Sequence, residues 1–119
     1  MKDYLYHYKC KVLEVYDGDT FRVEINLGFG LTWRGSDGRG VEIRMFGLNA
    51  PEMKGVSKAQ GTVSRDKLRE QILGKEITLK TVKDASEKFG RYLGIAITDE
   101  GTNINEWMIT EGYAQKMNY

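Results

Sequence analysis

Residues 17–27 read DGDTFRVEINL, and their pattern is the strongest indication of the fold class. After the turn, apolar and polar side chains alternate strictly, and the apolar ones all stand at odd numbers. This period of two is typical of a strand that packs one face on a core. The Asp-Gly-Asp turn follows an apolar-rich run at residues 4–16, so the two runs predict a β-hairpin. A change of parity at Leu13 predicts a bulge near the end of the first strand.

Three more strands are predicted downstream of this hairpin. Apolar residues again alternate with polar ones at residues 41–45, 77–82 and 93–97. The glycine-rich residues 28–40 stand between the second and third strands, and their composition predicts a long mobile loop.

Two helices complete the pattern. Residues 59–73 change to a helical period, with an inner face that includes Ser64, Leu68 and Ile72 and with Gly74 placed to end the helix. A short helix at residues 103–111 is predicted to start at an Asn cap.

The predicted order is three strands, a helix, two strands and a helix. This order fits a mainly β domain with helices (α+β), namely the five-stranded Greek-key barrel called the OB-fold. In that fold a helix lies between the third and fourth strands, and here a short helix follows at the C-terminal end. A length of 119 residues predicts a single domain spanning 1–119.

Composition excludes several classes of protein. Hydrophobic residues at 40% and charged residues at 29% are typical of a folded globular chain. One cysteine, Cys10, excludes an internal disulfide, and one histidine, His7, argues against zinc sites and histidine-based triads. No apolar run is long enough for a membrane span and no signal sequence precedes the domain, so we expect a cytoplasmic protein without membrane contact.

The net charge of +1 hides an uneven distribution. Residues 54–98 carry ten basic and five acidic side chains, which permits local contact with a polyanion. The balance falls short of the basic surface of a dedicated nucleic-acid binder.

Three clusters place charged side chains where predicted strands end: residues 15–21, 43–52 and 88–94. The acidic residues of the first cluster could simply form a hairpin turn. Arg44, in the second cluster, stands within an apolar strand, where it is either a solvated outward residue or a positioned cation in a groove. Oxygen ligands from Asp and Asn suit Ca²⁺ or Mg²⁺, and guanidinium groups suit phosphate oxygens, so the clusters together suggest phosphodiester cleavage.

These clusters, in this order and at this spacing, resemble the thermonuclease (staphylococcal-nuclease-like) family. The resemblance rests on Asp-Gly-Asp-Thr at 17–20, on Arg44 eight residues before Glu52 in an Ala-Pro-Glu block, and on Phe-Gly-Arg at 89–91. It spans roughly residues 8–117, and the barrel topology of the family agrees with the predicted strand order.

The resemblance implies an endonuclease that hydrolyses DNA or RNA with Ca²⁺ as cofactor and leaves 3′-phosphates. The implied catalytic residues are Arg44, Glu52 and Arg91. The implied metal site comprises Asp19, Asn49, the main-chain carbonyl of Ala50 and, as an outer-sphere partner, Asp17. Asn49 departs from the aspartate of the family, which removes one negative charge and is expected to weaken cation binding. The chain also lacks the last C-terminal helix of the family, so stability and part of the substrate groove are expected to differ.

Candidate nucleic-acid contacts are Lys88, Phe89, Tyr92 and Trp33. The aromatic rings of Trp33 and Tyr92 could stack on bases, although for Tyr92 the favoured interpretation is core packing on a strand. Two other functions stay open: an OB-fold module that binds nucleic acid without cleaving it, and a purely structural interaction barrel. The joint presence of the acidic, arginine and glutamate residues favours the nuclease, for which no obligate protein partner is implied.

Overall fold

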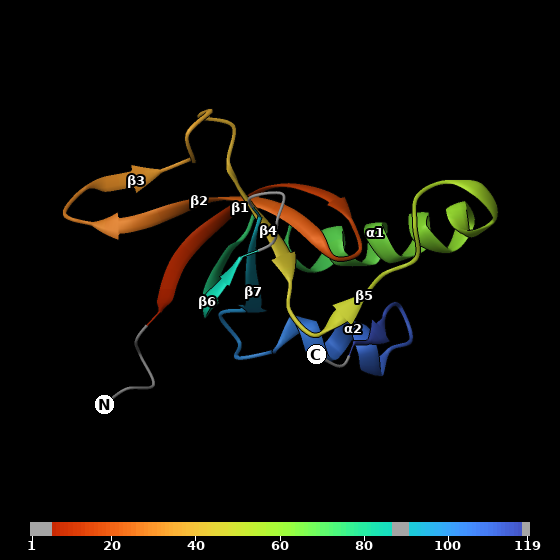
Figure 1. Cartoon of the computed structure of the whole chain (residues 1–119). Coiled ribbons are helices and arrows are strands. Elements are labelled where there is room, and N and C mark those ends of the chain that lie inside the picture. The colour runs from red at the N-terminus through yellow and green to blue at the C-terminus, as the bar shows by residue number, and fades with distance from the viewer. Residues whose placement is uncertain (1–5, 87–90, 118–119) are drawn as a thin grey trace.

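The computed structural model describes residues 6–86 and 91–117 and shows a closed barrel with two α-helices (Figure 1). The barrel strands are β1 (His7–Asp17), β2 (Thr20–Gly28), β4 (Val41–Met45), β6 (Glu76–Ser86) and β7 (Tyr92–Ile97). They pair in the order β1-β6-β7-β4-β2, and a further pairing of β1 with β2 closes the ring. Only β4 and β7 run parallel among these pairs. The five-stranded OB-type barrel predicted from the sequence is therefore confirmed.

The β1–β2 hairpin follows the predicted register. The odd-numbered apolar residues of β2 from Phe21 to Ile25 are buried, and β1 contributes Val12 and Val15 to the same core. The register shifts between Val12 and Glu14, which is the bulge expected at Leu13. A bulge increases the local twist and helps a sheet to close on itself.

The glycine-rich segment is not a loop throughout, and this corrects the prediction for residues 28–40. Its first part forms β3 (Leu31–Trp33), which pairs with the end of β2 in a hairpin that extends away from the barrel (Figure 1). Gly28, Phe29 and Gly30 all have positive φ (83°, 57° and 79°), so the glycines allow the tight reversal between the strands. The hairpin escaped prediction because its apolar residues are exposed and pack on no core.

The helices cover one side of the barrel. After a 3₁₀ turn, η2 (Gly55–Ser57), α1 (Lys58–Ile72) packs on β1 and buries Ser64, Leu68 and Ile72, the inner face predicted from the sequence. Gly74 adopts φ 74° and its N–H donates to the carbonyl of β1 residue Val12. The arginine at the end of α1, Arg69, donates to the carbonyl of Val15 as well.

The C-terminal residues pair with the segment that follows β4. The Asn103 side chain caps α2 (Ile104–Thr110) by accepting a hydrogen bond from the N–H of Glu106, as predicted. The short strands β5 (Leu48–Asn49) and β8 (Gln115–Lys116) pair beyond β4. Among the helices described, none is long and apolar enough to cross a membrane.

Candidate active site

Polar residues gather where the β1–β2 turn meets the end of β4. Thr20 of β2 stands opposite Arg44 of β4 in the sheet register, and the N–H of Met45 donates to the carbonyl of Asp19. Because side chains alternate along a strand, Arg44 lies on the outer face of β4 while Ile43 and Met45 enter the core. The barrel register therefore brings the first two sequence clusters together.

Arg44 is a positioned cation, although it lies on an outward-facing strand position. Its relative exposure is only 8%. Its Nη1 lies 3.1 Å from Asp19 Oδ2 and donates to the carbonyl of Met45, and its Nη2 donates a short hydrogen bond to Asn49 Oδ1. A guanidinium held by three partners keeps a defined direction, which excludes the solvated alternative.

Asp19 is buried and links three segments of the site. Its Oδ1 accepts from the hydroxyl of Thr20 at 3.0 Å, and its Oδ2 accepts from the N–H of Ala50 at 2.9 Å. The same Oδ2 pairs with Arg44. The segment that follows β5 is thus tied to the β1–β2 turn, so Asn49 and Ala50 lie beside the first cluster.

Asp17 adds a second carboxyl group to this turn. Its Oδ1 accepts from the N–H of Asp19 at 3.1 Å. Burial raises the pKa of Asp17 to about 7, and the hydrogen bond and negative charge of Asp19 raise it as well, while the N–H of Asp19 and the positive charge of Arg44 act in the opposite direction. Asp17 is therefore largely protonated below pH 7, and it adds a negative charge to the turn only above that pH.

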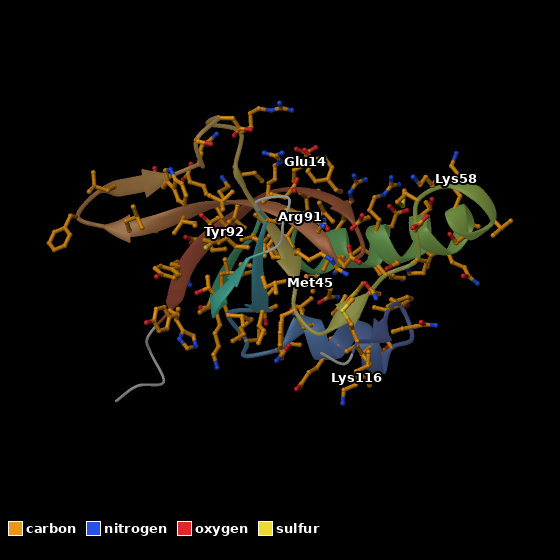
Figure 2. All side chains as sticks on the ribbon, viewed as in Figure 1. Glu14, Met45, Lys58, Arg91, Tyr92 and Lys116 are labelled. Carbon is orange, nitrogen blue, oxygen red and sulfur yellow. The ribbon has the colours of Figure 1, made fainter. Side chains whose placement is uncertain are left out.

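Arg91, just before β7, reaches the same turn from the neighbouring strand. Its Nη1 donates to the Thr20 hydroxyl at 3.4 Å, and its Nε lies 3.8 Å from Glu42 Oε2. Figure 2 labels Arg91 beside Tyr92 at the start of β7. Thr20, which donates to Asp19 and accepts from Arg91, therefore joins the third cluster to the first.

Glu52 lies apart from this hydrogen-bonded cluster. Its side chain is exposed on the wall of an open cleft of about 840 Å³, which Pro51, Gln60 and Tyr113 also line. Among the described residues, no hydrogen bond or ion pair engages its carboxylate. Its backbone is fixed more firmly, because the Ser57 hydroxyl donates to the Glu52 carbonyl at 3.2 Å.

Two glycines allow α1 to approach the site closely. A Cβ atom at Gly61 would lie 2.3 Å from the carbonyl oxygen of Glu52, and one at Gly18 would lie 1.9 Å from the hydroxyl oxygen of Ser64. Neither contact is sterically possible without a shift of the chain. The glycines therefore set the distance between the helix, the acidic turn and the Glu52 segment.

The family described as staphylococcal nuclease homologue matches residues 42–119. This chain belongs to that family. The matched part contains Arg44, Asn49, Glu52 and Arg91, while the acidic turn precedes it.

This staphylococcal nuclease homologue also resembles curated proteins. An "Uncharacterized endonuclease" of Escherichia coli O157:H7 is 29% identical over 104 residues, which is 87% of this chain and 58% of that protein. "Endonuclease YhcR" of Bacillus subtilis strain 168 is 30% identical over 116 residues, which is 90% of this chain and 9% of that protein. The chain thus spans about half of the first relative and a small part of the second.

The oxygen donors of this staphylococcal nuclease homologue fit a hard divalent cation. Within the described part of the chain, no three His, Cys, Asp or Glu side chains gather at one point. Asp19, with Asp17 as an outer-sphere partner, would therefore need the Asn49 amide, the Ala50 carbonyl and water to reach the roughly six to eight oxygens that Ca²⁺ takes. Asn49 Oδ1 accepts from Arg44 and keeps a second lone pair for a cation.

The predicted nucleic-acid contacts lie on two different parts of the barrel. Tyr92 of β7 is 45% exposed, so the core packing favoured for it was wrong, because β7 points this residue outward. Trp33 is 41% exposed on the projecting β3 hairpin. Lys88 and Phe89 lie outside the described residues.

The sequence interpretation did not single out Glu42 as a site residue. It stands two positions before Arg44 and shares its face of β4, and this spacing was the available signal. It was missed because its partners, Arg22 on β2 and Arg91 just before β7, come from other parts of the chain.

Proposed function

We propose that this domain hydrolyses phosphodiester bonds of DNA or RNA. The observation that carries the proposal is the convergence of Arg44 and Arg91 on the Asp19–Thr20 turn, one through an ion pair and the other through a hydroxyl. Two directed guanidinium groups beside a carboxylate are suited to a phosphate group approached by water. The endonuclease names of the relatives support this proposal.

In the proposed reaction a water oxygen forms a bond to phosphorus while the bond from phosphorus to the 5′ oxygen breaks, which leaves a 3′-phosphate. Glu52 accepts the proton of the attacking water, since its carboxylate is exposed on the cleft. Arg44 and Arg91 donate hydrogen bonds to the phosphate oxygens, on which negative charge grows as the bond forms. The leaving 5′ oxygen takes a proton from solvent.

Ca²⁺ is the proposed cofactor. Asp19, Asn49 and the Ala50 carbonyl would hold it, with Asp17 behind them, and it would supply charge stabilisation to the phosphate oxygens. The ion pair between Asp19 Oδ2 and Arg44 Nη1, at 3.1 Å, holds the arginine beside the acidic turn. The substrate phosphate would therefore meet a positive and a negative charge whose positions are already set. DNA and RNA share this phosphate chemistry, so either is a proposed substrate.

The test is cleavage of plasmid DNA and of labelled single-stranded DNA and RNA. We expect cleavage with added Ca²⁺, loss of cleavage with a chelator, and 3′-phosphate ends. Arg44→Lys keeps the charge but not the planar fork, so kcat should fall about 10²-fold with KM little changed. Arg39→Lys, a similar change in the exposed loop after β3, is the matched control and should cleave normally.

Glu52→Gln tests the proton acceptor. The variant keeps the shape of the side chain and should cleave about 10²- to 10⁴-fold more slowly, with unchanged thermal stability. A wild-type protein that binds oligonucleotides but cleaves none with Ca²⁺, Mg²⁺ or Mn²⁺ would show instead a binding module of the OB type.

A further inference from the structure

Glu42 lies on the outer face of β4, between the side chains of Arg22 and Arg91. Its Oε1 is 3.5 Å from Nη2 of Arg22, which stands directly opposite on β2, and its Oε2 is 3.8 Å from Nε of Arg91. Each carboxylate oxygen thus faces a different guanidinium group. We propose that Glu42, supported by Arg22, is a positioning residue that orients Arg91 toward the substrate phosphate. This inference rests on the proposed nuclease function.

Glu42 can restrict the direction of the Arg91 side chain, because its carboxylate lies beside the Arg91 guanidinium. Arg91 precedes the first residue of β7, and its side chain is 23% exposed. Its hydrogen bond to the Thr20 hydroxyl is long, at 3.4 Å. An arginine side chain has many rotamers, so an anion at one end of the guanidinium reduces the number of orientations that the group samples.

Glu42 can act as an anchor because Arg22 is held more rigidly than a surface arginine. Arg22 Nε donates to the Tyr16 hydroxyl at 3.0 Å, and its Nη1 donates to the Gly40 carbonyl at 3.0 Å. The guanidinium carbon also lies 5.5 Å from the centre of the Tyr16 ring. Three contacts from β1 and the loop before β4 therefore fix the cation that faces Glu42.

The loop after β3 takes part in this arrangement. Asp37 Oδ2 lies 3.5 Å from Arg22 Nη1, and a Cβ atom at Gly40, whose φ is 118°, would lie 2.9 Å from the Arg22 Cβ. The loop between β3 and β4 is therefore in contact with Arg22, which in turn contacts Glu42 and, through it, Arg91.

A purely structural role for Glu42 would act on stability, not on Arg91. The backbone ladders of β4 with β2 and with β7 already join these strands. Partly exposed ion pairs add little to stability, so the loss of Glu42 should leave the barrel folded. The loss of Glu42 should instead change the orientation of Arg91 and slow the chemical step.

The first experiment compares Glu42→Gln with Glu24→Gln. Glu24 is the matched control, because it is a β2 glutamate paired with Arg34 at 2.6 Å, away from Arg91. With a labelled oligonucleotide and Ca²⁺, we expect kcat of Glu42→Gln to fall about 10- to 10²-fold with little change in KM, since a small misplacement of a reacting group has effects of this size. Glu24→Gln should keep the wild-type kcat.

A double-mutant cycle with Arg91→Lys separates positioning from a general effect. If Glu42 acts through Arg91, then Glu42→Gln should add almost nothing to Arg91→Lys. Fully additive losses of kcat would overturn the proposal, and so would a Glu42→Gln protein that cleaves at the wild-type rate.

The last measurement does not depend on activity. The Nε–Hε signal of Arg91 in ¹⁵N NMR spectra is identified by its loss in Arg91→Lys. We expect it to report a restrained side chain in the wild type and in Glu24→Gln, and a more mobile one in Glu42→Gln. An unchanged signal in Glu42→Gln would overturn the positioning role. A wild type that cleaves nothing would refute the proposed function alone, because this NMR comparison still decides whether Glu42 orients Arg91.

Discussion

Replacement of Asp17 by Asn should stabilise the metal-free protein in neutral and weakly alkaline solution. The carboxyl group is half-buried, and burial together with Asp19 raises the pKa of Asp17 from an ordinary 3.8 to about 7. A group with a raised pKa in the folded state contributes its full stability below the unfolded pKa and loses it as the pH rises through the folded pKa. Above pH 7 the wild type therefore holds a charged Asp17 in an unfavourable place, and asparagine carries no charge there.

The expected gain in the free energy of unfolding follows from the same two pKa values of Asp17. A difference between pKa 3.8 and about 7 corresponds to an upper limit of about 4 kcal/mol, at about 1.4 kcal/mol for each tenfold change in the ionisation constant. Solvent screens a half-buried group, and Arg44 lies nearby, so we expect about 1–2 kcal/mol at pH 8. The Asn oxygen can still accept from the N–H of Asp19, so the turn is kept.

The assay is urea unfolding in the presence of a chelator at several pH values between 4 and 8. Asp37→Asn is the matched control, because the Asp37 carboxylate accepts from the N–H two residues later in the same way. Asp37 is exposed, and its pKa is lowered by this hydrogen bond and by nearby arginines. The gain for Asp17→Asn should disappear near pH 4, whereas Asp37→Asn should gain nothing at pH 8. An Asp17→Asn protein that is less stable than the wild type at pH 8 would refute this reasoning.

Three further predictions concern separate parts of the molecule. Cys10 is buried and burial raises its pKa to about 12, so a thiol reagent at pH 8 should modify it only after denaturation; fast reaction of the folded protein would show that the barrel opens there. Gly61→Ala should lower Tm although alanine favours helices by about 1 kcal/mol, because its Cβ would collide with the Glu52 carbonyl; a higher Tm would contradict the close approach of α1. Asn49→Asp should bind Ca²⁺ more tightly in calorimetric titration, since it adds a negative charge, and equal affinity would remove residue 49 from the metal site.

Much of the fold was predictable because the signals are local. Alternation along β2 reports which side chains face the core, and the helical period of α1 reports its buried stripe. Gly74 and Asn103 mark helix ends through backbone conformation and capping, which depend on few neighbours. The β3 hairpin was not predictable in this way, since its exposed apolar residues lack the core that makes alternation informative.

The barrel order and the three clusters that carry the family resemblance could be recognised from residue type and spacing along the chain, because these signals are local. Three relations appear only in the folded barrel: Arg44 is buried against Asp19, Thr20 is hydrogen-bonded to both Asp19 and Arg91, and Glu42 faces two arginines. The folded structure also leaves the Glu52 carboxylate exposed on the cleft. These relations depend on which strands become neighbours when the barrel closes, and the parallel pairing of β4 with β7 joins segments that are distant in sequence. The number of residues between two segments does not say how close they lie in the folded barrel.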